Sequence, residues 1–168
     1  GKTKEEIASY MKQTYLASDE KINLSIAIAE RERALLSRLD YKNGYSLYIG
    51  IPFCPSTCLY CSFTSYPLTS WKTQVDAYLD ALEKELDYVA AKNYHRKLNS
   101  IYIGGGTPTT LEPYQLDRLI RKIRCSFDLG DCLEFTVEAG RPDSITEEKL
   151  LVLRKNGISR ISINPQTM

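Results

Sequence analysis

Residues 45–61 read YSLYIGIPFCPSTCLYC and decide the fold. Aromatic and aliphatic side chains dominate the first seven residues, which is typical of a β-strand. Pro52 ends that strand because proline cannot donate a hydrogen bond to a sheet. Three cysteines then follow within eight residues, Cys54, Cys58 and Cys61. The segment therefore predicts a short strand that leads directly into a cluster of thiols.

Strands and helices alternate after this segment. We expect helices at residues 75–91, 114–124 and 146–155, and strands at residues 100–103, 133–138 and 158–163. The first helix carries one apolar stripe, formed by Val75, Leu79, Leu82, Leu86 and Val89. Strand–helix repeats at this spacing predict a parallel sheet with right-handed crossovers. The fold class is therefore α/β, with four βα units from residue 45 onward.

The N-terminal residues have a different pattern. Apolar residues at spacings of three and four predict helix over residues 4–39, with a second helix beginning after Ser18. The Asn43-Gly44 pair ends this region because it readily adopts positive φ. We expect a helical lead-in over residues 1–44 and a main domain over residues 45–168. Both ends of the sequence look cut, which predicts a fragment of a longer polypeptide.

Composition excludes several classes of partner. Lys and Arg number 22 against 21 Asp and Glu, so neither nucleic acid nor an anionic membrane is expected. No apolar run approaches the roughly 20 residues of a membrane helix, and residues 1–6 lack the apolar core of a secretory signal. We therefore expect a cytoplasmic protein. Five cysteines is an odd count, and clustered thiols in a reducing compartment indicate metal or cluster binding rather than disulfides.

The unusual residues converge on one rim of the expected sheet. Cys54 follows the first strand, Gly104 follows the second, Glu138 ends the third, and Gln166 follows the fourth. Parallel strands in α/β folds place their ligands at the carboxyl ends. This rim is therefore the predicted functional site.

The cysteine spacing C-x3-C-x2-C allows a tight loop to turn three thiolates toward one point. Three ligands leave one iron of a four-iron cluster open, whereas electron-transfer clusters commonly use four cysteines. A zinc site would require a fourth ligand. The single histidine, His95, lies in a charged helix tail, and Cys125 and Cys132 belong to the opposite, amino-terminal side of the third strand. Zinc and metal-free thiols are the alternatives.

These residues resemble a known family. The cysteine loop directly after a strand with Tyr48 and the pair Pro52-Phe53 resembles the radical S-adenosylmethionine enzymes. The run YIGIPFC at residues 48–54 and the run GGGTPT at residues 104–109 are similar to the oxygen-independent coproporphyrinogen III oxidase branch. One departure is Tyr60, where the family usually has phenylalanine. The resemblance covers residues 45–168 and implies a partial (βα) barrel of the radical SAM type.

The resemblance also implies a set of site residues. It implies that Cys54, Cys58 and Cys61 hold a [4Fe–4S] cluster. It further implies contacts to S-adenosylmethionine from Tyr48, Tyr60, Gly105, Gly106, Thr107, Glu138 and Gln166. Simple strand packing, a tight turn and a solvent-facing acid are the alternatives for Tyr48, the glycines and Glu138. Asn164-Pro165 stands where relatives often have Gly-Val, which leaves the position of Gln166 open.

The implied chemistry is radical-based. The open iron would chelate S-adenosylmethionine, and an external electron donor would reduce the cluster to release a 5′-deoxyadenosyl radical that takes hydrogen from a substrate. In this branch the substrate is coproporphyrinogen III, whose two propionates become vinyl groups. A haem chaperone, and a methyltransferase or ring-opening enzyme acting on haem, are the alternatives. Propionates call for Arg or Lys at the rim, where Arg141 is one of few. We expect substrate residues outside this chain, and the chain alone to be inactive.

Overall fold

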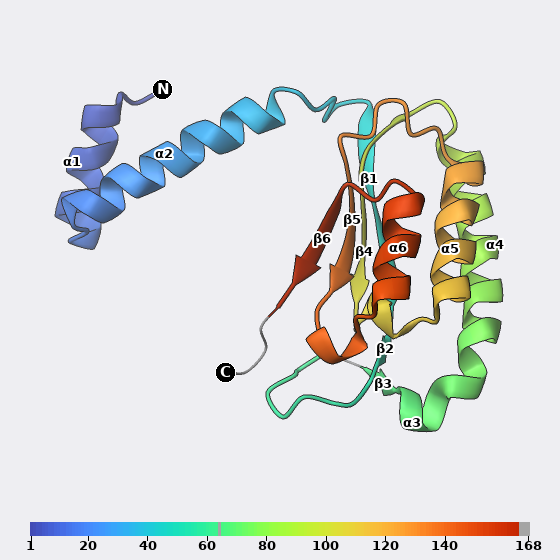
Figure 1. Cartoon of the computed structure of the whole chain (residues 1–168). Coiled ribbons are helices and arrows are strands. Elements are labelled where there is room, and N and C mark those ends of the chain that lie inside the picture. Colours follow the sequence, from blue (N-terminus) through green and yellow to red (C-terminus); the bar gives the residue numbers. More distant parts are fainter. Residues whose placement is uncertain (64, 165–168) are drawn as a thin grey trace. The chain divides into compact units, whose positions relative to one another are not determined.

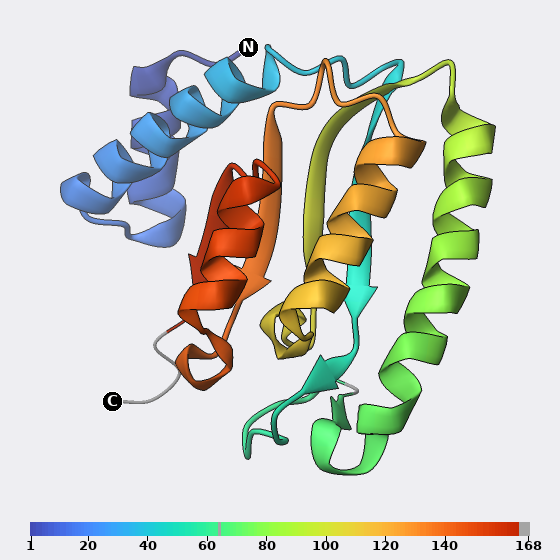
Figure 2. The same ribbon diagram turned by 45° about the vertical axis from the view of Figure 1, so that its right-hand side comes forward.

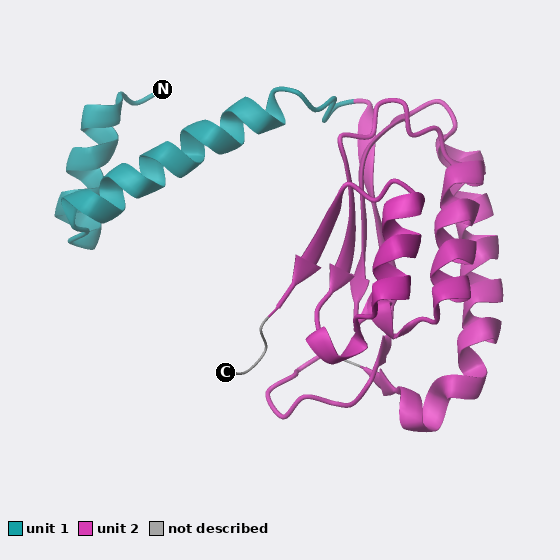
Figure 3. Ribbon diagram, in the orientation of Figure 1, with its two compact units in different colours: residues 1–42 teal, residues 43–168 magenta. Residues whose placement is uncertain are grey.

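The computed structural model describes residues 1–63 and 65–164, which form two compact units, residues 1–42 and 43–168 (Figure 3). The first unit consists of α1 (Lys4–Tyr15) and α2 (Asp19–Leu36). Thr3 and Glu6 form a capping box at the start of α1, and the side chain of Ser18 accepts from the N–H of Lys21 to cap α2. The predicted helical lead-in is therefore a pair of helices.

None of the helices in the described part of the chain has both the length and the apolar character needed to cross a bilayer.

The second unit is built on a four-stranded parallel sheet. Its strand order is β1 (Gly44–Ile51), β4 (Lys97–Gly105), β5 (Glu134–Ala139) and β6 (Arg160–Ile163). The connecting helices α4 (Val75–Asn93), α5 (Pro113–Ser126) and α6 (Glu147–Lys155) lie together on one face of the sheet (Figures 1 and 2). The predicted α/β class is confirmed. Within the described residues the fourth βα unit is represented by its strand.

The shorter elements gather near the carboxyl ends of the strands. They are β2 (Phe53–Cys54), β3 (Tyr66–Pro67), α3 (Leu68–Trp71), and three 3-10 helices, η1 (Lys72–Gln74), η2 (Pro108–Thr110) and η3 (Pro142–Ser144). β2 and β3 pair as a small parallel sheet, which the sequence pattern did not indicate.

The second strand of the sheet is longer than its sequence predicts. We expected it to span residues 100–103 and to be stopped by the glycines. In the structure β4 begins at Lys97, which pairs with Gly44, and it continues to Gly105, which pairs with Ile51. Pairing with β1 along its whole length overrides the weak strand propensity of these residues. The strand therefore carries the first two glycines to the rim.

The hydrophobic core lies between the sheet and its three helices. Alternate residues of the strands, among them Ile101, Ile103 and Val137, are completely or almost completely buried there. The predicted stripe of α4 packs against them, with Val75, Leu79, Leu82 and Leu86 buried and Val89 partly buried. The packing of the helices on this face fixes where the strands end at the rim of the sheet.

The other face of the sheet is polar. The Ser100 hydroxyl donates to Ser46 Oγ at 2.9 Å, and the guanidinium of Arg160 lies 3.2 Å from the Glu134 carboxylate. Tyr48 and Tyr102 stack with ring centroids 5.6 Å apart. None of the described helices of residues 43–164 lies on this face (Figure 2).

Two leucines on α6 test the position of the core. Leu153 is 1% exposed, whereas Leu151 is 56% exposed on the same helix. Leu153→Ala should lower the free energy of unfolding by about 2–5 kcal/mol because it leaves a cavity. Leu151→Ala should change it by less than about 0.5 kcal/mol. Urea unfolding of the reduced, metal-free chain measures both, and equal losses would contradict this packing.

Candidate functional site

The cysteine loop leaves the sheet and returns to nearly the same place. β2 and β3 pair at its base, and the N–H of Tyr66 donates to the Pro52 carbonyl at 2.9 Å. Within the loop, the N–H of Cys61 donates to the Cys58 carbonyl at 3.1 Å. These bonds hold the loop at the carboxyl end of β1.

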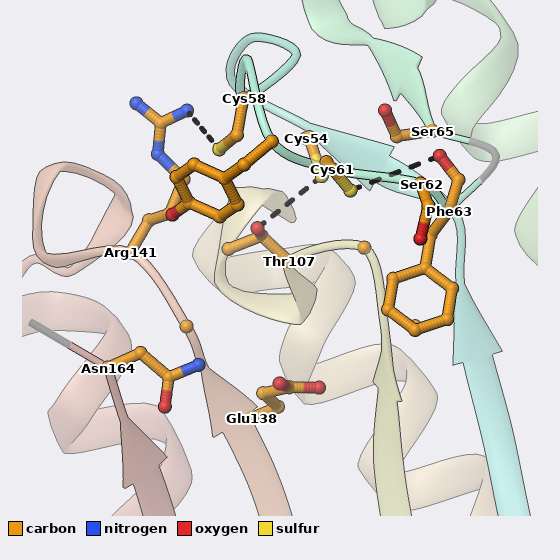
Figure 4. A pocket seen from close by; sticks show the side chains of 14 residues that line it. Cys54, Cys58, Cys61, Ser62, Phe63, Ser65, Thr107, Glu138, Arg141 and Asn164 are labelled. Atoms are coloured by element: carbon orange, nitrogen blue, oxygen red, sulfur yellow. Dashed lines mark hydrogen bonds between the residues drawn. The ribbon is translucent and has the colours of Figure 1, made fainter. Parts of the chain in front are cut away.

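The glycine loop is joined to the cysteine loop through its backbone. The N–H of Gly106 donates to the Ile51 carbonyl at 2.7 Å, and the N–H of Thr107 donates to the Phe53 carbonyl at 2.8 Å. The Thr107 hydroxyl also lies 3.6 Å from Cys54 Sγ (Figure 4). Two loops far apart in the sequence therefore form one structure.

Gly105 and Gly106 are required by the backbone around them. A Cβ on Gly106 would lie 2.6 Å from the Phe53 carbonyl oxygen and 3.0 Å from Cys54 Sγ, which is too close for any side chain. Gly105 has a φ of +107°, a conformation that side chains disfavour. The run is thus more than a tight turn, because the missing side chain lets the backbone approach Cys54.

A buried network continues from the glycine loop to the loop between β5 and α6. The Thr109 hydroxyl lies 2.6 Å from Ser144 Oγ. Lys149 on α6 donates to the Thr109 carbonyl at 2.7 Å and to the Ser144 carbonyl at 3.1 Å. Burial lowers the pKa of Lys149. This side chain therefore fastens the Thr-Pro-Thr segment to the end of the third strand, a role that sequence reasoning missed.

The loops enclose a cavity of about 240 Å³ at the rim of the sheet. Most of the expected site residues line it, namely Cys54, Cys58, Tyr60, Cys61, Gly105, Gly106, Thr107 and Glu138. Asn164, after β6, lines it too, so all four strand ends contribute (Figure 4). Tyr48 lies outside this lining, on the polar face of the sheet. Gln166 is outside the described residues.

The three thiols have different neighbours. Cys54 Sγ lies by Thr107, Cys58 Sγ lies 3.9 Å from an Arg141 nitrogen, and Cys61 Sγ lies 4.0 Å from the Phe63 carbonyl oxygen (Figure 4). Burial raises the pKa of Cys54, an effect that the Thr107 hydroxyl opposes. The three thiols thus line one cavity, each beside a different neighbour.

This arrangement bears on the choice of metal. In the described part of the chain, no three His, Cys, Asp or Glu side chains are placed to hold a single metal ion. A zinc ion needs its ligands close around one centre, whereas an iron–sulfur cube accepts each thiolate on a different iron. Three thiols that line one cavity but are not placed to hold a single ion therefore fit a cube better than a zinc ion.

Glu138 lies beside the glycine loop. Burial raises the pKa of this carboxyl, and hydrogen bonds from the Gly105 N–H and the Tyr102 hydroxyl oppose that rise. Glu138 is therefore not a simple solvent-facing acid. Sequence reasoning missed Tyr102, although its even spacing from Gly104 places it on the same side of the strand.

The remaining titratable candidates lie elsewhere. His95 and Cys125 are exposed, and the Cys132 thiol donates to the Glu134 carbonyl at 3.4 Å near the start of β5. None of the three lines the cavity. Arg141 does line it, and it is the one cationic residue among the described residues that do so.

Comparison with known proteins gives a consistent set of relatives. The family model described as the radical SAM superfamily matches residues 48–168. The Bacillus subtilis oxygen-independent coproporphyrinogen-III oxidase-like protein HemZ is 44% identical over 171 residues, covering 99% of this chain and 34% of that protein. The heme chaperone HemW of B. subtilis is 45% identical over 123 residues, covering 73% of this chain and 32% of that protein.

A solved structure agrees with these matches. Coproporphyrinogen III oxidase (HemN) from Escherichia coli, described as a radical SAM enzyme, superposes with a TM-score of 0.64 at 33% identity. The match covers 78% of this chain and 30% of that protein. The chain spans about a third of the length of the curated relatives it matches.

The close approach at Gly106 can be tested with one methyl group. Gly106→Ala should lower the free energy of unfolding by about 1–3 kcal/mol because Phe53 and Cys54 must move. Gly50→Ala is the control, since a Cβ there has no neighbour within 4 Å, and its effect should stay within about 1 kcal/mol. Urea unfolding of both variants measures the difference, and indistinguishable midpoints would refute the close approach.

The burial of Glu138 predicts a pH dependence of stability. Because its pKa is raised in the folded chain, the folded state binds this proton more tightly than the unfolded state. That contribution is fully present below the unfolded pKa and is lost as pH rises through the folded pKa. Glu138→Gln cannot ionise, so its stability relative to the original chain should increase as pH rises above about 4, the ordinary range of a glutamate. Urea midpoints across this range measure the trend, with Glu148→Gln, exposed on α6, as the control. A constant difference would contradict the prediction.

Proposed function

Because this chain belongs to the radical SAM superfamily, whose cofactors are a [4Fe–4S] cluster and S-adenosylmethionine, we propose that Cys54, Cys58 and Cys61 hold the cluster. All three thiols line one cavity at the carboxyl ends of the strands. The described part of the cavity lining contains no fourth cysteine or histidine, which agrees with a cluster that keeps one iron open. This shared cavity is the observation on which the proposal rests.

The neighbouring residues fit the second cofactor. Gly105 and Gly106 bring backbone to the cavity where a side chain is disfavoured, Thr107 adds a hydroxyl, and Glu138 brings a carboxylate that suits an amino group. Tyr60 lines the same cavity. Tyr48 lies on the polar face near Glu138, and burial together with the charge of Glu138 raises the pKa of the Tyr48 hydroxyl. We assign these residues, with Gln166, to S-adenosylmethionine. When bound, the two cofactors supply the hydrogen-abstracting chemistry of the family.

The chain's own residues position these groups. Thr107 holds the Cys54 thiol from one side, and the Gly106 N–H locks the glycine loop to the end of β1. Tyr102 and the Gly105 N–H orient the Glu138 carboxylate. The core behind the sheet keeps the four strand ends in register. Their task is therefore to orient the groups that would hold the cofactors.

We assign the full-length protein to oxidative decarboxylation of coproporphyrinogen III in haem biosynthesis, as a cytoplasmic enzyme served by an external electron donor. The assignment is supported by 44% identity to a coproporphyrinogen-III oxidase-like protein over 99% of the chain, and by the fold match to the E. coli oxidase. A porphyrinogen substrate is small, so neither nucleic acid nor membrane is needed as a partner.

A haem chaperone is the second candidate. It is favoured by 45% identity to the heme chaperone HemW over 73% of the chain. A methyltransferase or ring-opening enzyme acting on haem has no such support, because none of the three relatives above carries such a name.

Anaerobic assay of the full-length protein separates these candidates. With S-adenosylmethionine, a reductant and coproporphyrinogen III, we expect 5′-deoxyadenosine and vinyl product. Tight haem binding without vinyl product would instead indicate the chaperone.

Replacing the proposed cluster ligands tests the site itself. Cys54→Ser, Cys58→Ser and Cys61→Ser should each lose most iron and sulfide and lower 5′-deoxyadenosine formation by at least about a hundredfold. Cys125→Ser and Cys132→Ser are the controls, since neither residue lines the cavity, and both should retain iron and activity. Full iron content in the first three variants would exclude these ligands.

A further inference from the structure

Arg141 connects the end of the third strand to the cysteine loop. One of its terminal nitrogens donates to Ser56 Oγ at 2.7 Å and to the Ser56 carbonyl at 3.3 Å. The same nitrogen lies 3.9 Å from Cys58 Sγ, within reach of a hydrogen bond to sulfur (Figure 4). These contacts join positions 85 and 83 residues apart in the sequence.

The other side of the guanidinium is also held. Arg141 Nε donates to Asp143 Oδ1 at 3.0 Å, and its second terminal nitrogen forms an ion pair with the same carboxylate. The Ser144 hydroxyl donates to the Arg141 carbonyl at 2.7 Å, and Ser144 belongs to the buried network around Lys149. The side chain is 20% exposed. The planar guanidinium therefore joins Asp143, just after the third strand, to Ser56 in the cysteine loop.

The residues that Arg141 contacts lie in the loop, beyond the paired strands at its base. β2 and β3 pair at Phe53–Cys54 and Tyr66–Pro67, whereas Ser56 and Cys58 lie between them. Without an additional bond, a segment of this kind would exchange between conformations. The bonds from Arg141 hold it where Cys58 faces the cavity.

The charge of Arg141 has a second consequence. An iron–sulfur cluster becomes more negative when it accepts an electron, so a cationic donor beside a ligand sulfur stabilises the reduced form more than the oxidised form. Hydrogen bonds to cluster sulfurs and nearby charges both set reduction potentials. The ion pair with Asp143 moderates this effect, but the nitrogen that faces Cys58 is a different one.

We propose that Arg141 is a positioning residue that orders the cysteine loop through Ser56 and raises the reduction potential of the cluster through Cys58. This inference rests on the proposed function, because it takes Cys58 as a cluster ligand. The ordering of the loop does not depend on the cluster and can be measured without it.

Potentiometric titration of the full-length, anaerobically reconstituted protein tests the electrostatic part. Arg141→Gln should reduce the ratio of reduced to oxidised cluster at a fixed potential about tenfold, equivalent to a shift of about 59 mV to more negative values. Arg141→Lys keeps the charge and should shift less. Arg160→Gln, which also breaks an arginine–carboxylate pair, is the matched control and should leave the midpoint unchanged. An unchanged midpoint in Arg141→Gln at full iron content would overturn the proposal.

Amide hydrogen exchange of the full-length apoprotein tests the ordering. Exchange of the Cys61 amide, which donates to the Cys58 carbonyl, should accelerate about tenfold in Arg141→Gln and in Ser56→Ala, and the double variant should add little to either. Arg160→Gln should not accelerate it. If Arg141→Gln does not fold, Ser56→Ala and Arg141→Lys give the same test. Unchanged exchange in Ser56→Ala would refute the claim that Arg141 orders the loop through Ser56. Absence of an iron–sulfur cluster in the unaltered protein would refute the proposed function but would not affect this exchange result.

Discussion

The site depends on the contact between the backbone of Gly106 and the chain around Cys54. The Gly106 N–H bonds to the Ile51 carbonyl, and the space that a Cβ would need is occupied by Phe53 and the Cys54 thiol. Because the contact is between backbone atoms, no side chain can replace it. It brings the loop after β4 against the loop after β1, and the cavity exists only because these two loops meet. This contact determines where the site lies, and the other lining residues determine its shape and charge.

The two faces of the sheet have different roles, one in packing and the other in presenting polar groups. Its helix-facing side is apolar and almost fully buried, which fixes the strand ends. Its other side carries hydroxyls, tyrosines and charged groups, including the stacked pair of Tyr48 and Tyr102. Glu138 lies where the polar face meets the rim, half-buried and bonded to Tyr102. A polar face beside a thiol-lined cavity gives room for a polar cofactor next to a metal cluster.

Local pattern predicted most of the fold, since the strands, helices and rim follow from periodicity and from residues such as Pro52 and the Asn43-Gly44 pair. The sequence also predicted that the cysteines, Thr107 and Glu138 lie at one end of the sheet. Contacts between distant segments were not predictable in this way. Arg141 reaches Ser56 across 85 positions, and Lys149 bonds to Thr109 across 40, so no local window contains both partners. The pairing of β2 with β3 was missed because two-residue strands leave no periodic signal.

The buried ammonium of Lys149 has a mechanical consequence. It donates hydrogen bonds to both the Thr109 and the Ser144 carbonyls, from a helix that follows both residues in the chain. A displacement of α6 would break these bonds unless both loops moved with it, and breaking them would strand a charge away from water. The helix, the glycine loop and the turn after β5 are therefore expected to move as a single rigid body.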